Sequence, residues 1–288
     1  MNRVIIVSGT LYLCATPIGN LGDMTFRAVE ILKTVDLIAA EDTRNTLRLL
    51  NHFDIKTPMT SYHQHNMETK GPLLIEKLEA GENIALVTDA GMPGISDPGE
   101  DMARRCYQEG IPVTIVPGAS AGISALVLSG MDARRYVFEG FLPVDKKERA
   151  GVLKNLEKET RTTVFYEAPH RLTDTLKALL DAAGDREAAT VREITKKFEE
   201  VRRDSLSGLL EYYRENPPRG EFVIIVGGMS KSALRQEEID SWAETPIEDH
   251  LKIYMDKGMS KKDAMKAVAK DRGVSKRDIY ACLNNGER

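Results

Sequence analysis

Short apolar runs alternate with helix-favouring segments over the first 230 residues, and this alternation constrains the fold more than any other feature. The runs within residues 83–87 and 223–226 are apolar at consecutive positions rather than at every second one. Strands of that kind are buried on both faces, as in a sheet that lies between layers of helices. The pattern therefore predicts an α/β fold.

The expected elements follow from β-branched runs and from the helix-favouring stretches between them. Strands are predicted at 11–15, 36–40, 83–88, 112–116, 162–166, 188–193 and 222–226. Helices are predicted at 27–34, 72–80, 101–109, 172–183 and 206–214. The length of 288 residues suggests about two domains. We expect α/β domains over 1–117 and 118–229, and a helical extension over 236–288.

The C-terminal segment differs from the rest of the chain in pattern and in charge. Residues 257–277 hold eight Lys and Arg but two acidic residues, although the whole chain has a net charge of −4. Ser260 and Ser275 are each followed by Asp three residues later, which predicts two N-caps, and Gly273 should end the first of two short helices. The expected apolar stripes of these helices are Ala264, Met265, Val268 and Ala269, then Ile279, Cys282 and Leu283.

This basic helical pair is a candidate nucleic-acid-binding element, because clustered cations attract phosphates. An ordinary solvated helical hairpin is the equally weighted alternative. The expected RNA contacts in the tail are Lys261, Lys262, Lys266 and Arg277.

Composition excludes several classes of protein. No apolar run approaches the roughly 18 residues that cross a bilayer, so no membrane partner is expected. The three cysteines are far apart and show no paired metal-ligand spacing, which favours a reduced, cytoplasmic compartment. Residues 1–7 faintly resemble a signal peptide, but Ser8, Gly9 and Thr10 interrupt the apolar stretch and a strand from Leu11 fits better.

Three clusters of glycine and proline directly follow predicted strands, at residues 15–23, 88–99 and 117–121. Ligands of open α/β sheets bind outside the carboxyl ends of the strands. Glycine lets a ligand approach the backbone, and proline stiffens the loop so that less entropy is lost on binding. One such cluster alone is most simply a tight turn. Three at one sheet edge predict a small-molecule site.

The contents of these loops exclude the commonest nucleotide sites. The sequence contains no G-x-x-x-x-G-K-[ST] motif, and no G-x-G-x-x-G motif follows the first predicted strand. A P-loop and a standard dinucleotide site are therefore not expected. The second cluster begins with Asp89, whose carboxylate suits ammonium or hydroxyl groups better than exposed phosphates.

Four polar clusters remain. Glu41, Asp42 and Arg44 could organise a hydroxyl substrate, or Asp42 or Thr43 could cap a helix over 45–51. Residues 166–171 place an aromatic ring, an acid, an imidazole and a guanidinium together, which makes His170 and Arg171 candidate substrate contacts. Residues 192–197 could form a rim for an anion or RNA. His63 and His65 have no evident third ligand, so no metal is expected.

The segments 17–23, 40–44, 89–99 and 117–121 resemble the tetrapyrrole methylase superfamily. Together with 140–143, 166–171 and 220–222 they resemble one branch, the ribosomal RNA small subunit methyltransferase I family. Members of that family 2′-O-methylate a cytidine of 16S rRNA. The resemblance covers nearly the whole chain, and the residues before Leu11 are its least familiar part.

The resemblance implies two α/β domains with S-adenosylmethionine in the cleft between them, a homodimer, and 16S rRNA or the small ribosomal subunit as partner. By motif position the cofactor residues would be Pro17, Ile18, Asp89, Gly91, Met92, Pro93, Ser120, Ala121, Tyr166, Ala168, Gly220 and Glu221. Among these, Asp89, Gly91, Met92 and Pro93 would hold the methionine and ribose portions.

A ribose hydroxyl is weakly acidic and benefits from a general base. The candidate catalytic residues are Glu41, Asp42, Arg44, Glu167 and His170, and the sequence does not choose among the acids and the imidazole. Arg171, Lys196 and Lys197 are further candidate RNA contacts. Methylation of a small tetrapyrrole precursor and a non-catalytic nucleotide-binding module are the alternatives.

Overall fold

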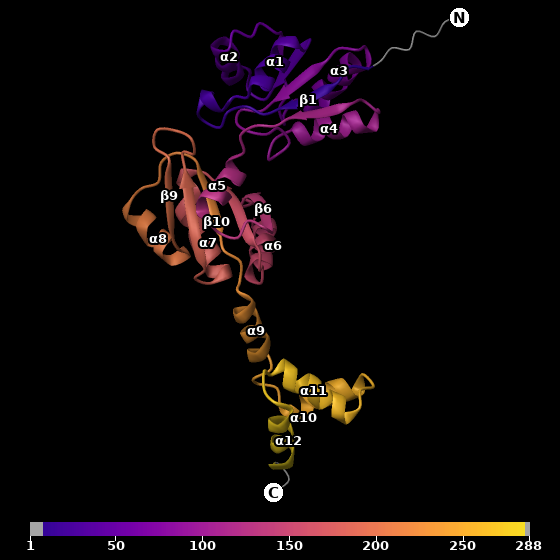
Figure 1. The fold of residues 1–288 in the computed structure, drawn as a ribbon, viewed down its shortest axis with the longest axis vertical. Helices are drawn as coiled ribbons and strands as arrows, with labels where there is room; N and C mark the ends of the chain where they lie inside the picture. Colours follow the sequence, from indigo (N-terminus) through magenta and orange to yellow (C-terminus); the bar gives the residue numbers. More distant parts are fainter. Residues whose placement is uncertain (1–7, 286–288) are drawn as a thin grey trace, which may run out of the picture.

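The computed structural model describes residues 8–285, so the interpretation of residues 1–7 lies outside the described residues. Figure 1 shows three successive parts along the long axis: an α/β unit at the top, a second α/β unit below it, and a helical tail. The α/β expectation is confirmed, because the elements form two five-stranded sheets with helices packed against them.

The first sheet is entirely parallel and has the order β3-β2-β4-β1-β5. Its strands are β1 (Leu11–Cys14), β2 (Leu37–Ala40), β3 (Met59–Ser61), β4 (Ile84–Val87) and β5 (Val113–Val116). All four residues of β4 are buried, as expected for a central strand covered on both sides. The helices of this unit are α1 (Phe26–Thr34), α2 (Thr43–His52), α3 (Met67–Glu79) and α4 (Gly99–Gln108), with a 3-10 turn η1 (Leu21–Asp23).

The second sheet has the order β6-β7-β10-β8-β9, in which β6 and β7 are parallel and the other pairs are antiparallel. Its strands are β6 (Tyr136–Phe141), β7 (Thr162–Glu167), β8 (Glu187–Arg192), β9 (Glu200–Ser205) and β10 (Phe222–Val226). The helices are α5 (Ala121–Ser129), α6 (Lys146–Glu157), α7 (Leu172–Ala183) and α8 (Leu206–Glu215), with a 3-10 turn η2 (Pro169–Arg171).

Alternate residues of the central strand β10 pack into two separate cores. Ile224 lies in the core formed with α6, α7 and α8, whereas Val223 and Ile225 pack with α5. Burial of both faces explains why this strand is apolar at every position.

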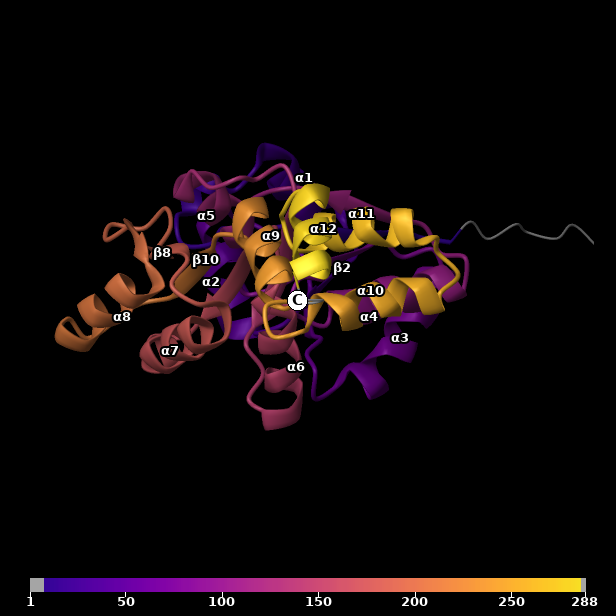
Figure 2. The same ribbon diagram turned by 90° about the horizontal axis from the view of Figure 1, so that it is seen from below.

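The tail contains α9 (Lys231–Asp240), α10 (Ile247–Asp256), α11 (Lys261–Asp271) and α12 (Lys276–Asn285). Ser260 caps α11 by accepting the N–H of Asp263, and the Ser275 hydroxyl accepts the N–H of Asp278, as predicted. Figure 1 shows these helices as a separate cluster joined to the second sheet through α9, and Figure 2 shows the same helices from below, in front of the two α/β units.

The two expected helices form as α11 and α12, whereas α9 and α10 were not predicted individually; α10 packs on α11. One expectation about the tail was wrong. Cys282 is exposed instead of joining the stripe of Ile279, which is buried.

The sequence also missed β3, β6 and β9, which occupy sheet edges, and the helices α5 and α6. Among residues 8–285 no helix is both long and apolar enough to cross a membrane.

Candidate active site

The glycine- and proline-rich loops converge because β4, β1 and β5 are neighbouring parallel strands whose carboxyl ends share one edge. A short antiparallel bridge joins two of the loops: Thr16 N–H donates to the Gly91 carbonyl at 2.9 Å, and Gly91 N–H returns a bond of 3.1 Å. The Thr16 hydroxyl also donates to the Thr88 carbonyl at 3.1 Å. The prediction of three loops at one sheet edge is confirmed.

The loop after β4 takes its shape from Asp97. One carboxylate oxygen accepts the N–H groups of Gly94 and Gly99, each at 2.8 Å, and the other accepts the N–H of Ile95 at 3.2 Å. Gly91 has a φ of +83° in the same loop, a backbone conformation that L side chains rarely adopt. A tight loop with exposed backbone results.

A cavity of about 610 Å³, here called the main cavity, lies between the two sheets. The first unit contributes the loops after β1, β2 and β4, and the second contributes α5 and the ends of β6, β7, β8 and β10. Predicted site residues that line it are Ile18, Glu41, Asp89, Gly91, Met92, Ser120, Ala121, Tyr166, Glu167, Ala168, Lys196 and Glu221.

Tyr166 forms much of the aromatic wall. Its ring packs edge-on against Phe138 and Phe141, with centroids 5.0 and 5.7 Å away. Its hydroxyl accepts the N–H of Gly122 in the first turn of α5 at 3.2 Å. Burial raises the pKa of Tyr166, so the ring stays neutral near pH 7.

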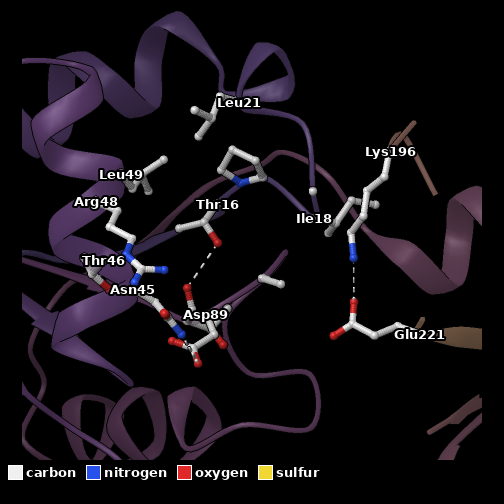
Figure 3. Close-up of a pocket in the computed structure, with 14 residues that line it drawn as sticks. Thr16, Ile18, Leu21, Asn45, Thr46, Arg48, Leu49, Asp89, Lys196 and Glu221 are labelled. Carbon is white, nitrogen blue, oxygen red and sulfur yellow. Dashed lines mark hydrogen bonds and ion pairs between the residues drawn. The ribbon is translucent and has the colours of Figure 1, made fainter. Parts of the chain in front are cut away.

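A second pocket of about 320 Å³, here called the side pocket, adjoins the main cavity (Figure 3). Its lining comes from the loop after β1, from α2 and from the loop after β4. The residues that border both spaces are Ile18, Thr88, Asp89, Ala90, Lys196 and Glu221.

Asp89 lies on this shared wall, and both of its carboxylate oxygens accept hydrogen bonds. Oδ1 accepts the N–H of Asp42 and Oδ2 accepts the side-chain amide of Asn45, each at 3.2 Å. Partial burial, and secondly the nearby charge of Glu41, raise the pKa of Asp89 above its usual range.

Glu41 and Asp42 have structural partners. Glu41 Oε2 accepts the Thr88 hydroxyl at 2.6 Å and the Asp89 N–H at 3.3 Å, which fixes the start of the β4 loop. Asp42 caps α2 through the Arg44 N–H at 2.8 Å and pairs with the Arg44 guanidinium, also at 2.8 Å. Hydrogen bonding from Arg44 lowers the pKa of Asp42 to about 2. The helix-capping interpretation is therefore confirmed for Asp42.

Glu167 is buried and also has structural partners. Its oxygens accept the Ala168 N–H at 2.8 Å and the Thr175 hydroxyl at 2.6 Å. Arg171 Nε lies 3.5 Å from the same carboxylate, and Arg171 Nη2 donates to the Leu142 carbonyl at 2.6 Å. Arg171 thus supports the turn that follows β7. His170 is exposed on η2.

Residues 193–199 form a loop from the second unit that contacts the first. Lys196 Nζ pairs with Glu193 and Glu221 at 3.1 Å each. Glu193 and Thr195 have φ values of +51° and +65°, which are uncommon for residues other than glycine. Gly220, with a φ of +84°, is needed beside this loop because a Cβ there would come within 2.6 Å of Glu193.

Not every predicted residue borders these two spaces. Pro17 lines the side pocket alone. The predicted residues that line neither space are Asp42, Arg44, Pro93, His170, Arg171, Lys197 and Gly220. Lys261, Lys262 and Lys266 belong to α11 and Arg277 belongs to α12, and none of them lines either space. Among residues 8–285 no group of three or more His, Cys, Asp or Glu side chains is arranged to hold a metal ion.

Sequence reasoning missed the face of α2 that lines the side pocket. Asn45, Arg48 and Leu49 occupy positions i, i+3 and i+4, which lie on one side of a helix. That spacing was a usable signal, because the helix over 45–51 was itself expected.

Comparison with known proteins matches residues 10–210 to the family of tetrapyrrole (corrin/porphyrin) methylases. The chain is 47% identical over 273 residues to the ribosomal RNA small subunit methyltransferase I of Bacillus subtilis, covering 94% of this chain and 93% of that one. It is 49% identical to the protein of that name from Halalkalibacterium halodurans and 47% identical to the one from Synechocystis. Both matches cover 94% of this chain. They cover 93% of the Halalkalibacterium protein and 96% of the Synechocystis protein.

Solved structures resemble the fold at low sequence identity. Diphthine synthase superposes with a TM-score of 0.63 at 15% identity, covering 79% of this chain and 95% of that one. A uroporphyrin-III-C-methyltransferase from Thermus thermophilus gives 0.55 at 20% identity, covering 76% and 94%.

Proposed function

We propose a function from one premise: the chain belongs to the tetrapyrrole methylase family and, within it, to the ribosomal RNA small subunit methyltransferase I family. The proposed reaction is transfer of a methyl group from S-adenosylmethionine to RNA of the small ribosomal subunit. In finer detail, we propose the 2′-oxygen of a cytidine in 16S rRNA as the acceptor. The observation that carries this proposal is the main cavity, which the family's motif segments line from both sheets.

The residues of the main cavity fit S-adenosylmethionine. Its volume of about 610 Å³ lies within the range of small-molecule sites. Tyr166, Phe141 and Val223 offer an apolar surface suited to an adenine ring, and Glu41 offers a carboxylate suited to an ammonium or to ribose hydroxyls. The positive φ of Gly91 keeps the backbone of that loop accessible.

When bound, S-adenosylmethionine supplies a methyl group on a sulfonium that is already electrophilic. The chain's task is therefore to place the acceptor oxygen in line and to exclude water. The loop of residues 193–199 helps to exclude water, because Lys196 borders both spaces and pairs with Glu193 and Glu221.

An RNA substrate accounts for the charge distribution. An acidic chain of net charge −4 repels RNA as a whole, whereas residues 257–277 concentrate basic side chains on a separate helical cluster. Lys261, Lys262 and Lys266 belong to α11, and Lys261 and Lys262 are exposed. A small tetrapyrrole substrate needs no such extension.

The proposal includes a homodimer formed through α5. Ile123, Val127 and Leu128 are 45, 68 and 41% exposed on this helix, although its other side packs on the second sheet. Three exposed aliphatic side chains on one helix favour contact with a second copy of the chain.

Radiolabelled methyl transfer tests the proposal. The protein is incubated with methyl-labelled S-adenosylmethionine and, separately, small ribosomal subunits, naked 16S rRNA or uroporphyrinogen. We expect the label in RNA, on the ribose of a cytidine. Deamination of the base should therefore leave the label in place. Label in the tetrapyrrole alone would overturn the substrate, and cofactor binding with no label in any acceptor would favour the non-catalytic module.

A further inference from the structure

The side pocket has a chemical character of its own. Pro17, Leu21 and Leu49 supply apolar surface, and Asn45 and Arg48 supply polar groups from the same helix face as Leu49. Figure 3 shows Arg48 extending from α2 toward Asn45 and Asp89, while Lys196 approaches from the opposite side. The pocket thus combines aliphatic contacts with two cations, of which Lys196 is already paired with Glu193 and Glu221.

Within residues 8–285, Arg48 differs from Arg44, one turn earlier on α2, in having no side-chain partner. The Arg44 guanidinium is paired with Asp42 at 2.8 Å. The Arg48 guanidinium forms no ion pair or hydrogen bond with any group of residues 8–285, although its side chain lines the pocket. A cation presented to a pocket without a carboxylate partner suits an anionic ligand.

The volume limits what that ligand is. About 320 Å³ lies near the lower end of small-molecule pockets and suits a single nucleoside rather than a macrocycle of four pyrrole rings. Enzymes that modify one nucleotide of a strand take it out of the stack into a fitted pocket. The aliphatic side chains can pack against the faces of a base, and Arg48 suits one of its phosphates.

We propose that the side pocket holds the target nucleotide, with Arg48 contacting one of its phosphates and Asp89 facing its 2′-hydroxyl. This inference rests on the proposed function, since it names the subsite through which the same reaction takes its acceptor. Asp89 is the carboxylate held by Asn45 at 3.2 Å on the wall between the side pocket and the main cavity.

That position gives Asp89 the role of proton acceptor. The O2′–H bond breaks and its proton passes to a carboxylate oxygen of Asp89 while O2′ forms a bond to the methyl carbon. The carbon–sulfur bond breaks, and its electron pair remains on the sulfur. Burial and Glu41 raise the pKa of Asp89, which makes it a stronger base than an exposed aspartate. Asp42, by contrast, is committed to the cap of α2.

Nucleotide titration tests the pocket without turnover. Cytidine 3′,5′-bisphosphate is titrated into the full-length protein saturated with S-adenosylhomocysteine, and binding is followed by calorimetry and by NMR. Arg48→Gln should weaken binding on the order of tenfold, because one charge-assisted contact is lost. The matched control is Arg214→Gln, which removes an exposed arginine from the last turn of α8, and binding should be unchanged. Equal affinity for wild type and Arg48→Gln would overturn the proposal.

A second variant tests Asp89. With cofactor saturating, Asp89→Asn should slow single-turnover methylation of small subunits by roughly 10² to 10⁴ and change nucleotide affinity less than threefold. An undiminished rate would remove Asp89 from proton transfer.

The proposed function and the side-pocket assignment are tested by different outcomes. If wild type methylates RNA and the Arg48 and Asp89 variants match it, the side-pocket assignment falls and the proposed function stands. If wild type methylates no RNA, the proposed function falls, and the nucleotide titration still decides the pocket.

Discussion

The hydroxyl of Thr195 donates a hydrogen bond of 2.5 Å to Oδ2 of Asp23, joining residues 172 positions apart. Thr195 lies in the loop after β8 of the second sheet, and Asp23 ends the 3-10 turn after β1 of the first. Its neighbour Lys196 borders both the main cavity and the side pocket. This bond therefore ties the two sheets together beside the candidate site.

Thr195→Val should loosen that tie. Valine keeps the branched shape but removes the donor, and one partly exposed hydrogen bond contributes about 1 kcal/mol. Dissociation of S-adenosylhomocysteine, followed by stopped-flow fluorescence, should become about two- to fivefold faster, with the melting temperature nearly unchanged. An unaltered dissociation rate would mean that the tie does not restrain the site.

Asp97→Ala should disorganise the loop after β4, because three backbone N–H groups lose their acceptor. We expect cofactor affinity to fall by at least tenfold and the loop to become susceptible to proteolysis. Asp97→Asn keeps one oxygen for Gly94 and Gly99 and should lose less. Calorimetry and limited proteolysis check this, and equal affinities in all three proteins would contradict it.

The cysteines should differ in reactivity. Burial raises the pKa of the Cys14 and Cys106 thiols to about 12, whereas Cys282 is exposed. At pH 8 only about one in ten thousand of the buried thiols is ionised, so they should be inert. Ellman's reagent should react quickly with one thiol per native chain and with three after unfolding. Rapid reaction of all three in the native protein would contradict the buried environment.

Val127→Arg tests the proposed association through α5. Val127 is 68% exposed, so arginine is tolerated in the monomer but places a charge in the interface. Sedimentation velocity should show a dimer for wild type and a monomer for the variant. Lys158→Ala, on another surface of the same unit, is the control. A monomeric wild type would refute the dimer outright.

The central strands were predictable from the sequence because burial on both faces makes them continuously apolar. β10 was predicted over its full extent, and β4 was predicted one residue too long at each end. The strands that were missed all lie at sheet edges. β9 has the sequence EVRRDS, whose charges suit an edge that must resist pairing with another chain. β6 contains a register shift near Gly140, which hides the alternation of a strand.

The site was predictable in part, for a different reason. Gly91 and its loop were identified because glycine and proline after a strand carry a local signal. Arg48 was missed because the spacing of Asn45, Arg48 and Leu49 indicates a shared helix face, whereas only the fold shows that this face meets the loop after β1. The hydrogen bond from Thr195 to Asp23 is likewise a long-range contact, which a local sequence pattern does not predict.

Truncation after Met229 tests the role of the tail. No described residue of α9 to α12 lines the main cavity, so binding of S-adenosylhomocysteine should persist. Methylation of RNA should fall, and its dependence on salt should flatten, because the basic residues of 257–277 are lost. Full activity with an unchanged salt slope would show that the tail takes no part in RNA binding.

The most direct test of the account is a crystal structure with S-adenosylhomocysteine bound. We predict the ligand between the two sheets, with its adenosine beside Tyr166 and Val223 and its sulfur directed toward Asp89 and the side pocket. An empty space between the sheets, with the ligand elsewhere or absent at saturating concentration, would contradict the central claim.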